Sequence, residues 1–211
     1  MGGKVTADLV RKKYITWQEG QYLLSFTNNI SPMFIISYVV WQNLKDTSRT
    51  MPALLILILS PILCSFLFRI YYRPGARSRS SKCSPLPRAA AGSLMDSCIM
   101  NGFEAITKVG GYIMLFSILI ALFQNLPLNH FLFSLLFLPS LEMTNGIPLI
   151  CASSLPADAC FVLSLALTSF GGWCSVAQTR SMVQGTRPYL IEKLITTLVT
   201  SLLAYTYIRL F

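Results

Sequence analysis

The stretch that decides the fold is Met51–Phe68, MPALLILILSPILCSFLF. It carries no charge, and as a helix it reaches across roughly 27 Å, close to the thickness of a bilayer's hydrocarbon core. Pro52 suits the first turn of such a helix, and Pro61 is expected to kink it. Arg69 and the pair Tyr71–Tyr72 follow directly, which is typical of a membrane interface. The sequence therefore predicts a membrane-spanning helix here.

The composition extends this prediction to the whole chain of 211 residues. The sequence is 54% hydrophobic and 12% charged, whereas soluble domains carry roughly 25% charged residues. Its net charge of +9 comes mainly from basic residues beside apolar runs, such as Arg11–Lys13 and the acid-free block between Arg69 and Arg88. This distribution follows the positive-inside rule. We expect the lipid bilayer as the partner, the cell membrane as the location, and no nucleic-acid binding.

Residues 73–92 are rich in Pro, Ser and Arg and lack apolar periodicity. This composition is typical of a flexible linker. It divides the chain into 1–72 and 93–211, and its basic charge predicts a cytoplasmic location. Met51–Phe68 then runs inward, and the basic flank Lys4–Lys13 is also cytoplasmic.

The second half contains several apolar segments that polar residues interrupt. We expect an interfacial helix at Ser93–Lys108, followed by a span at Gly110–Leu126. A further segment begins at Phe131 and stops at Glu142–Pro148, and a short apolar run, Ala157–Thr168, ends at Ser169–Gly172. The final span is expected at Leu190–Leu210. In the first half, Tyr22–Gln42 is interrupted in the same way at Thr27–Pro32.

These interruptions are the main functional signal. Irregular backbone at membrane depth is tolerated only where protein buries it or where it lines a water-filled cavity. Short, Gly/Pro-interrupted segments in both halves indicate a transporter-like binding site. We therefore predict an all-α, polytopic membrane protein with discontinuous helices and a polar cavity. The candidate cavity residues are Asn28, Asn29, Ser31, Glu142, Thr144, Asn145, Ser169, Gly171, Gly172 and Gln178.

Each candidate group also has a purely structural interpretation. The polar residues from Asn28 to Ser31 could form a loop outside the membrane. Glu142 could stabilise the fold through Lys108 or Arg180, because a carboxylate within a membrane needs a partner or a path for water. The pair Gly171–Gly172 could serve close helix packing.

The chain shows no pattern of residues that indicates an enzyme. It lacks a phosphate-binding G-x-x-x-x-G-K-[ST] loop, and its single histidine, His130, has no nearby carboxylate or nucleophile. Six cysteines occur without a C-x-x-C pair, so we expect no metal site, no cofactor and no disulfide. The first dozen residues are polar and charged, which is unlike a secretory signal peptide.

Five separated stretches resemble one family. They are GGKVTADLVRKKYIT (2–16), EGQYLLSFTNNISPMFII (19–36), KVGGYIMLFSIL (108–119), LEMTNGI (141–147) and SFGGWCSVAQTRSMVQGT (169–186). In this order they resemble the YlbJ-type sporulation integral membrane proteins, which carry nucleoside-recognition Gate repeats. The resemblance covers nearly the whole chain and is weakest in the linker.

The resemblance implies two inverted repeats of helices and half-helices and an association with endospore formation, but it supplies no substrate. In the family, a stretch like Gly2-Gly3-Lys4 follows a Ser-Gly-Tyr-Pro turn and several spans. We therefore expect 1–72 to be an incomplete first repeat and 93–211 the second repeat. Two functions follow as hypotheses: moving or gating a small polar solute, or acting without flux as a membrane scaffold that binds other membrane proteins or itself.

Overall fold

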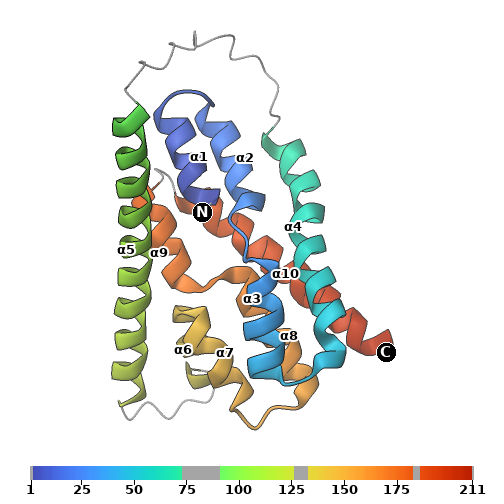
Figure 1. Cartoon of the computed structure of the whole chain (residues 1–211). Helices are drawn as coiled ribbons and strands as arrows, with labels where there is room; N and C mark the ends of the chain where they lie inside the picture. The colour runs from blue at the N-terminus through green and yellow to red at the C-terminus, as the bar shows by residue number, and fades with distance from the viewer. Residues whose placement is uncertain (1, 73–90, 126–132, 183–185, 211) are drawn as a thin grey trace.

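A computed structural model describes residues 2–72, 91–125, 133–182 and 186–210. All regular structure in these residues is helical (Figure 1). In chain order the elements are α1 (Gly2–Arg11), α2 (Trp17–Thr27), α3 (Pro32–Phe34), the π-helix η1 (Ile35–Leu44), the 3-10 helix η2 (Thr47–Arg49), α4 (Thr50–Tyr72), α5 (Ala91–Gln124), the π-helical segment η3 (Phe133–Phe137), α6 (Leu138–Leu141), α7 (Met143–Cys151), α8 (Ala157–Phe170), α9 (Gly172–Met182) and α10 (Thr186–Leu210). The predicted all-α class is confirmed for the described residues. The predicted linker 73–92 lies outside them except for its last two residues, and His130 and Cys83 also lie outside.

Four helical stretches of the described residues are long and apolar enough to cross a membrane. They are Trp17–Leu44, Thr47–Tyr72, Met95–Gln124 and Ala157–Ser181. This finding supports the prediction of a helical membrane protein. The predicted final span lies within α10 but is not one of the four, because polar residues that include Glu192 and Lys193 interrupt its apolar run.

The helix α4 contains the uncharged stretch Met51–Phe68. It is continuous through Pro61, and its buried residues recur every three or four positions, from Ala53 through Leu57 and Cys64 to Phe68. That spacing places them on one face of a helix. The buried face packs against α2 and α10, while the other face is apolar and exposed. An exposed apolar face of this kind is the face that a membrane helix turns to lipid.

The core lies where α10 crosses α8 and α4 (Figure 1). Phe161 and Leu165 of α8 pack there against Ile35 of η1, Ala53 of α4 and Ala204 of α10. Within a bilayer such side chains hold helices together by van der Waals packing, because lipid tails are as apolar as the side chains. This cluster fixes how the first half of the chain packs against the second.

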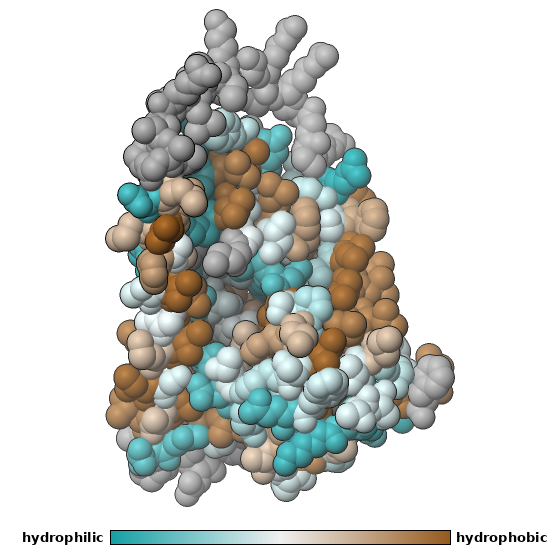
Figure 2. Space-filling view, viewed as in Figure 1, coloured by the Kyte–Doolittle hydropathy of each residue, from teal (hydrophilic) through white to brown (hydrophobic). Residues whose placement is uncertain are grey.

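The helix α5 corrects one expectation. The predicted interfacial helix Ser93–Lys108 and the predicted start of a new span at Gly110 form one continuous helix. Gly110 and Gly111 do not interrupt it, because a helix interior tolerates glycine at a cost of only about 1 kcal/mol. Neither glycine has a neighbour that a Cβ would meet among the described residues, so neither serves close packing. Apolar side chains cover α5 at one lateral edge of the molecule and α4 at the other (Figure 2).

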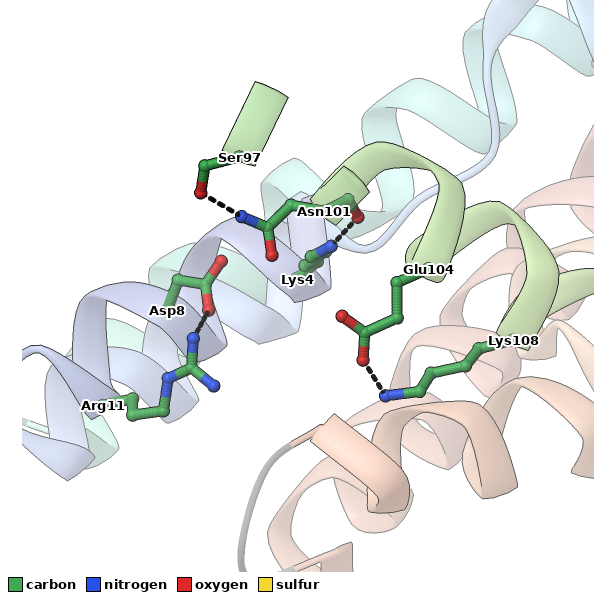
Figure 3. A network of polar contacts seen from close by, with 7 residues as sticks. All are labelled: Lys4, Asp8, Arg11, Ser97, Asn101, Glu104 and Lys108. Atoms are coloured by element: carbon green, nitrogen blue, oxygen red, sulfur yellow. Dashed lines mark hydrogen bonds and ion pairs between the residues drawn. The ribbon is translucent and has the colours of Figure 1, made fainter. Parts of the chain in front are cut away.

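A polar network joins the N-terminal half of α5 to α1 (Figure 3). The ammonium of Lys4 donates to the backbone oxygen of Asn101. Within α1, Arg11 pairs with Asp8 at 2.9 Å, and within α5, Lys108 pairs with Glu104. Lys108 therefore does not serve as the partner of Glu142, because an acidic residue one helical turn away already holds it.

Candidate functional site

The turn between α2 and α3 occupies the polar stretch singled out in the first half. The helix α2 ends at Thr27, and its C-cap Asn28 has a non-helical backbone. The hydroxyl of Ser31 then accepts from the backbone N–H of Phe34, and Pro32 occupies the first helical position. Ser and Pro at these positions start helices because they satisfy or remove a free N–H. The sequence thus ends one helix and starts another within four residues.

The side chain of Asn28 ties this turn to the C-terminal helices. Its amide donates to the hydroxyl of Tyr189 at 2.8 Å and to that of Thr179 at 3.4 Å. Tyr189 is fully buried on α10, and Thr179 belongs to α9. The end of α2 is therefore fixed against both elements.

The central residue of the site is Lys193, which lies near the start of the predicted final span and is not among the ten candidate residues. Its ammonium Nζ donates to the backbone oxygen of Asn28 at 2.9 Å, to Oδ1 of Asn29 at 3.4 Å and to the backbone oxygen of Ser169 at 3.5 Å. Only 5% of the residue is exposed. No carboxylate of the described residues lies within ion-pairing distance of it. The cation is therefore held by these oxygens and by the ring of Tyr189, whose centroid lies 5.9 Å from Nζ.

These oxygens explain how a lone cation can be buried. Asn28 caps the C-terminus of α2, and Ser169 lies in the last turn of α8. The C-terminus of a helix carries unpaired carbonyls and a partial negative charge of roughly half an electron. Lys193 thus compensates two helix ends at once. A signal for it was available, because an ionisable residue inside a predicted span indicates a functional site by default.

The hydroxyls around Ser169 complete this cluster. Its Oγ accepts from Oγ1 of Thr200 at 3.0 Å, and Thr200 is fully buried. A cavity of about 460 Å³ opens beside it. Its wall is mainly apolar, with five polar residues: Asn29, Ser65, Thr168, Ser169 and Lys193. A mostly apolar cavity with a few convergent polar groups is the usual form of a small-molecule site.

A second cavity, of about 420 Å³, lies between α1, α5 and α9. Asn28, Gln178 and Thr179 contribute polar groups to its wall. Gln178 donates to the thiol sulfur of Cys174 at 3.1 Å. Since Asn29 lines the first cavity and Asn28 the second, the end of α2 lies between the two cavities.

Glu142 is buried at the start of α7, with 2% of its surface exposed. Its carboxylate accepts from the backbone N–H groups of Thr144 and Asn145, both at 2.9 Å, and from both of their side chains. The amide of Asn145 also donates to Oγ of Ser117 on α5 at 2.7 Å. No cation of the described residues, Arg180 included, lies within ion-pairing distance of Glu142. The carboxylate is therefore stabilised as a helix N-cap, by N–H groups rather than by a cation.

The predicted stop over Glu142–Pro148 is wrong in its extent. Only Glu142 leaves the helical conformation, and Met143–Cys151 is a helix that includes Pro148. Proline removes the N–H that would bond the backbone oxygen of Thr144. The hydroxyl of Tyr38 on η1 donates to that oxygen instead. A tertiary contact thus allows the helix to continue.

Gly171 and Gly172 form the turn between α8 and α9. Their φ angles are +79° and +78°, in the left-handed region that favours glycine. The N–H of Gly171 donates to the backbone oxygen of Leu167 at 2.8 Å. A Cβ at Gly172 would lie 3.1 Å from the backbone oxygens of Ser140 and Leu141. The turn therefore packs directly on the junction before Glu142.

The first half repeats this arrangement. A Cβ at Gly2 would overlap the backbone oxygen of Thr27, and Gly3 lies against the side chain of Asn28. Gly2-Gly3 and Gly171-Gly172 thus each lie at the start of a helix, α1 or α9, that packs on the end of another helix, whereas Gly110-Gly111 lies inside α5. A Thr-Asn pair lies at each junction, Thr27-Asn28 and Thr144-Asn145. The shared Thr-Asn pair is a signal in the sequence from which the similarity of the two junctions could have been predicted.

The structure places the ten candidates in two groups and two separate positions. Asn28, Asn29 and Ser169 meet at Lys193. Glu142, Thr144 and Asn145 meet at the start of α7, beneath the Gly171–Gly172 turn. Ser31 only caps α3, and Gln178 lies in the second cavity.

Comparison with known proteins adds no relative. The chain matches no protein-family profile, no curated protein and no solved structure. Only the fold and the site therefore define its class. The described residues form a helical protein that has four helices long and apolar enough to cross a membrane, and buried charges of both signs lie at helix ends.

Proposed function

We propose that this chain is a transporter-like integral membrane protein that moves or gates a small polar solute, as its resemblance to the YlbJ-type sporulation family suggests. The observation that carries the proposal is the position of Lys193. It joins the ends of α2 and α8 and lines an open cavity of about 460 Å³. In this proposal the interrupted helices are discontinuous membrane helices and the cavity admits water.

The physical argument concerns the cost of polar groups in lipid. A charged side chain within a bilayer costs at least about 2.5–3.5 kcal/mol, so it is retained where it serves structure or function. Lys193 serves structure through the carbonyls that it caps. Structural capping does not explain the adjoining cavity, where Asn29, Ser65 and Ser169 present polar groups beside the same cation. A solute that hydrogen-bonds to these groups accounts for both features.

The proposal includes two Gate-type repeats, an incomplete one in 1–72 and a second in 93–211, joined by a cytoplasmic linker at 73–92. Support comes from Gly2-Gly3 and Gly171-Gly172, each of which lies at the start of a helix that packs on a junction with a Thr-Asn pair. An arrangement of this kind suits alternating access, in which one repeat moves against the other around a fixed site.

A non-transporting scaffold is the alternative, and the exposure of α5 favours it. The apolar side chains of Ile99, Phe103, Ile106, Met114 and Ile118 are all more than half exposed along this helix. A helix with so few internal contacts is free to pack against a partner helix or a second copy of the chain. In the scaffold hypothesis the cavity is dry and carries no flux.

Accessibility of the cavity to water separates the two hypotheses. In a background without native cysteines, Ser65→Cys places a thiol on the cavity wall, and Leu63→Cys places one two residues away on an exposed apolar face. We expect a charged, membrane-impermeant thiosulfonate to label the Ser65→Cys protein at least about tenfold faster, since thiolates form only in water. Equally slow labelling of both would reject a hydrated cavity and favour the scaffold.

Flux is the direct test. Proteoliposomes are assayed for uptake of radiolabelled uridine, adenosine, inorganic phosphate and alanine, with Asn29→Ala as the cavity variant. Asn29 is exposed on the cavity wall, so its replacement should leave the fold intact. Uptake of one solute that falls in the Asn29→Ala protein supports the proposal. Uptake no faster than in protein-free liposomes for the whole panel counts against transport.

A further inference from the structure

Lys193 has a buried acidic neighbour, Glu192, that faces a different part of the molecule. Glu192 lies on the wall of a groove of about 660 Å³, between the start of α2, the end of α4 and the start of α10. The wall includes the rings of Trp17, Tyr71 and Tyr72 and the side chain of Arg187. This groove shares no wall residue with the Lys193 cavity.

The carboxylate of Glu192 is only partly satisfied. Just 3% of the residue is exposed. Oε1 accepts a hydrogen bond from the hydroxyl of Tyr72. Oε2 is also buried, and in the part of the chain that the structure describes it has no hydrogen-bond donor. A buried carboxylate oxygen without a donor is costly, and each such group calls for an explanation such as a bound ligand.

The rest of the wall identifies the kind of ligand. Aromatic rings beside a carboxylate attract an ammonium group, and Arg187 offers a fork of donors suited to a phosphate. The apolar side chains of Leu67 and Ile191 lie on the same wall and are 59% and 57% exposed. The groove therefore combines the acidic Glu192 and the basic Arg187 with an exposed apolar surface.

The position of the groove matches this chemistry. It lies at the end of α4, where Arg69 and the tyrosine pair Tyr71–Tyr72 follow the apolar stretch. Tyrosine, tryptophan and arginine gather at the headgroup level of a bilayer. A ligand in this groove would thus have its polar end at the interface and its apolar end in the hydrocarbon core.

We propose that this groove binds a phospholipid with a primary ammonium headgroup, of the phosphatidylethanolamine class. The ammonium donates to Oε2 of Glu192 between the aromatic rings, Arg187 binds the phosphate, and the acyl chains lie on Leu67 and Ile191. A choline headgroup has no N–H to donate, and a glycerol headgroup has no positive charge. The site therefore prefers ethanolamine to both.

Native mass spectrometry of the purified full chain in detergent tests this. The protein is mixed with equal amounts of phosphatidylethanolamine, phosphatidylcholine and phosphatidylglycerol that carry the same acyl chains. We expect about tenfold more ethanolamine adduct than either other adduct, since one charge-assisted hydrogen bond contributes about 1.5 kcal/mol. Equal adduct levels for the three lipids would overturn the proposal.

Two variants assign the preference to its residues. Glu192→Gln keeps the shape and should remove the ethanolamine preference. Arg187→Gln, at an exposed position, should lower all three adducts about equally and keep the preference. Circular dichroism verifies that each variant is folded, and Arg187→Gln still decides the proposal if Glu192→Gln fails to fold. An unchanged preference in Glu192→Gln, or unchanged adduct levels in Arg187→Gln, would overturn the assignment.

Two further outcomes concern other occupants of the groove. Soluble O-phosphoethanolamine should raise the melting temperature much less than the whole lipid, because it lacks the acyl chains. An equal effect would assign the groove to a soluble ammonium compound rather than a lipid. A dimer that Arg187→Gln abolishes, in place of lipid adducts, would assign the groove to a second copy of the chain.

Discussion

Glu142 and Lys193 are buried charges of opposite sign at opposite kinds of helix end. The carboxylate of Glu142 accepts from N–H groups at the start of α7. The ammonium of Lys193 donates to carbonyl oxygens at the ends of α2 and α8. Each charge thus meets the helix dipole of opposite sign, without an ion-pair partner among the described residues. In a low-dielectric surrounding this compensation lets helices end inside the fold.

The first prediction concerns Lys193. Lys193→Met keeps most of the side-chain volume but leaves the backbone oxygens of Asn28 and Ser169 without this donor. We expect the free energy of unfolding in detergent to fall by about 1–3 kcal/mol. Leu194→Met, at the next position on the exposed side of α10, is the control and should have little effect. A Lys193→Met protein as stable as this control would mean that Lys193 does not hold the two helix ends together.

The second prediction concerns the cap of α7. Glu142→Gln removes the charge that faces the helix N-terminus and places an amide N–H₂ among N–H donors. We expect it to cost about 1–2 kcal/mol of unfolding free energy. The matched control is Glu104→Gln, which alters an exposed carboxylate on α5 and should leave the melting temperature unchanged. Equal melting temperatures for the two variants would argue against the capping role of Glu142.

The third prediction compares two glycines. Gly172→Ala forces a side chain onto a residue with φ of +78° and toward the backbone of Ser140 and Leu141. It should destabilise the protein by about 1–3 kcal/mol. Gly110→Ala lies inside α5 in open space and should stabilise it by about 0.5–1 kcal/mol. Thermal unfolding by circular dichroism measures both shifts, and shifts of the same sign would contradict the described backbone.

The fourth prediction concerns the pair Tyr38 and Pro148. Tyr38→Phe removes the donor to the backbone oxygen of Thr144 and should cost about 1 kcal/mol. In a Pro148→Ala background that oxygen gains a backbone N–H from position 148, so the same change should cost much less. A double-mutant cycle measures this coupling. If the cost of Tyr38→Phe is the same in both backgrounds, the hydroxyl does not replace the missing helical bond.

Much of the fold could be read from local patterns. The apolar run around Pro61 became α4, and the turn residues Ser31-Pro32 and Gly171-Gly172 lie where helices start and end. These features depend on neighbours in sequence, namely on apolar length, on N-capping and on the positive φ of glycine. The sequence also placed Asn28, Asn29 and Ser169 at helix ends, although their common partner was not predicted.

Other features were beyond sequence reasoning for identifiable reasons. Gly110–Gly111 looks like a helix boundary in the sequence, but nothing in the structure opposes a continuous helix there. Pro148 looks like a helix breaker, but Tyr38, more than a hundred positions earlier, replaces the hydrogen bond that proline removes. Lys108 looked like a partner for Glu142, but Glu104 lies one turn away on the same helix.

The sequence by itself determined the class of the protein, because apolar length and the near absence of charge decide locally whether a helix suits a membrane. Only the tertiary structure decided which polar groups meet. Lys193 reaches Asn28 across 165 positions of the chain, and Glu192, its neighbour, faces a separate groove. Adjacent residues on a helix point about 100° apart, so packing of distant helices alone determines what each one contacts.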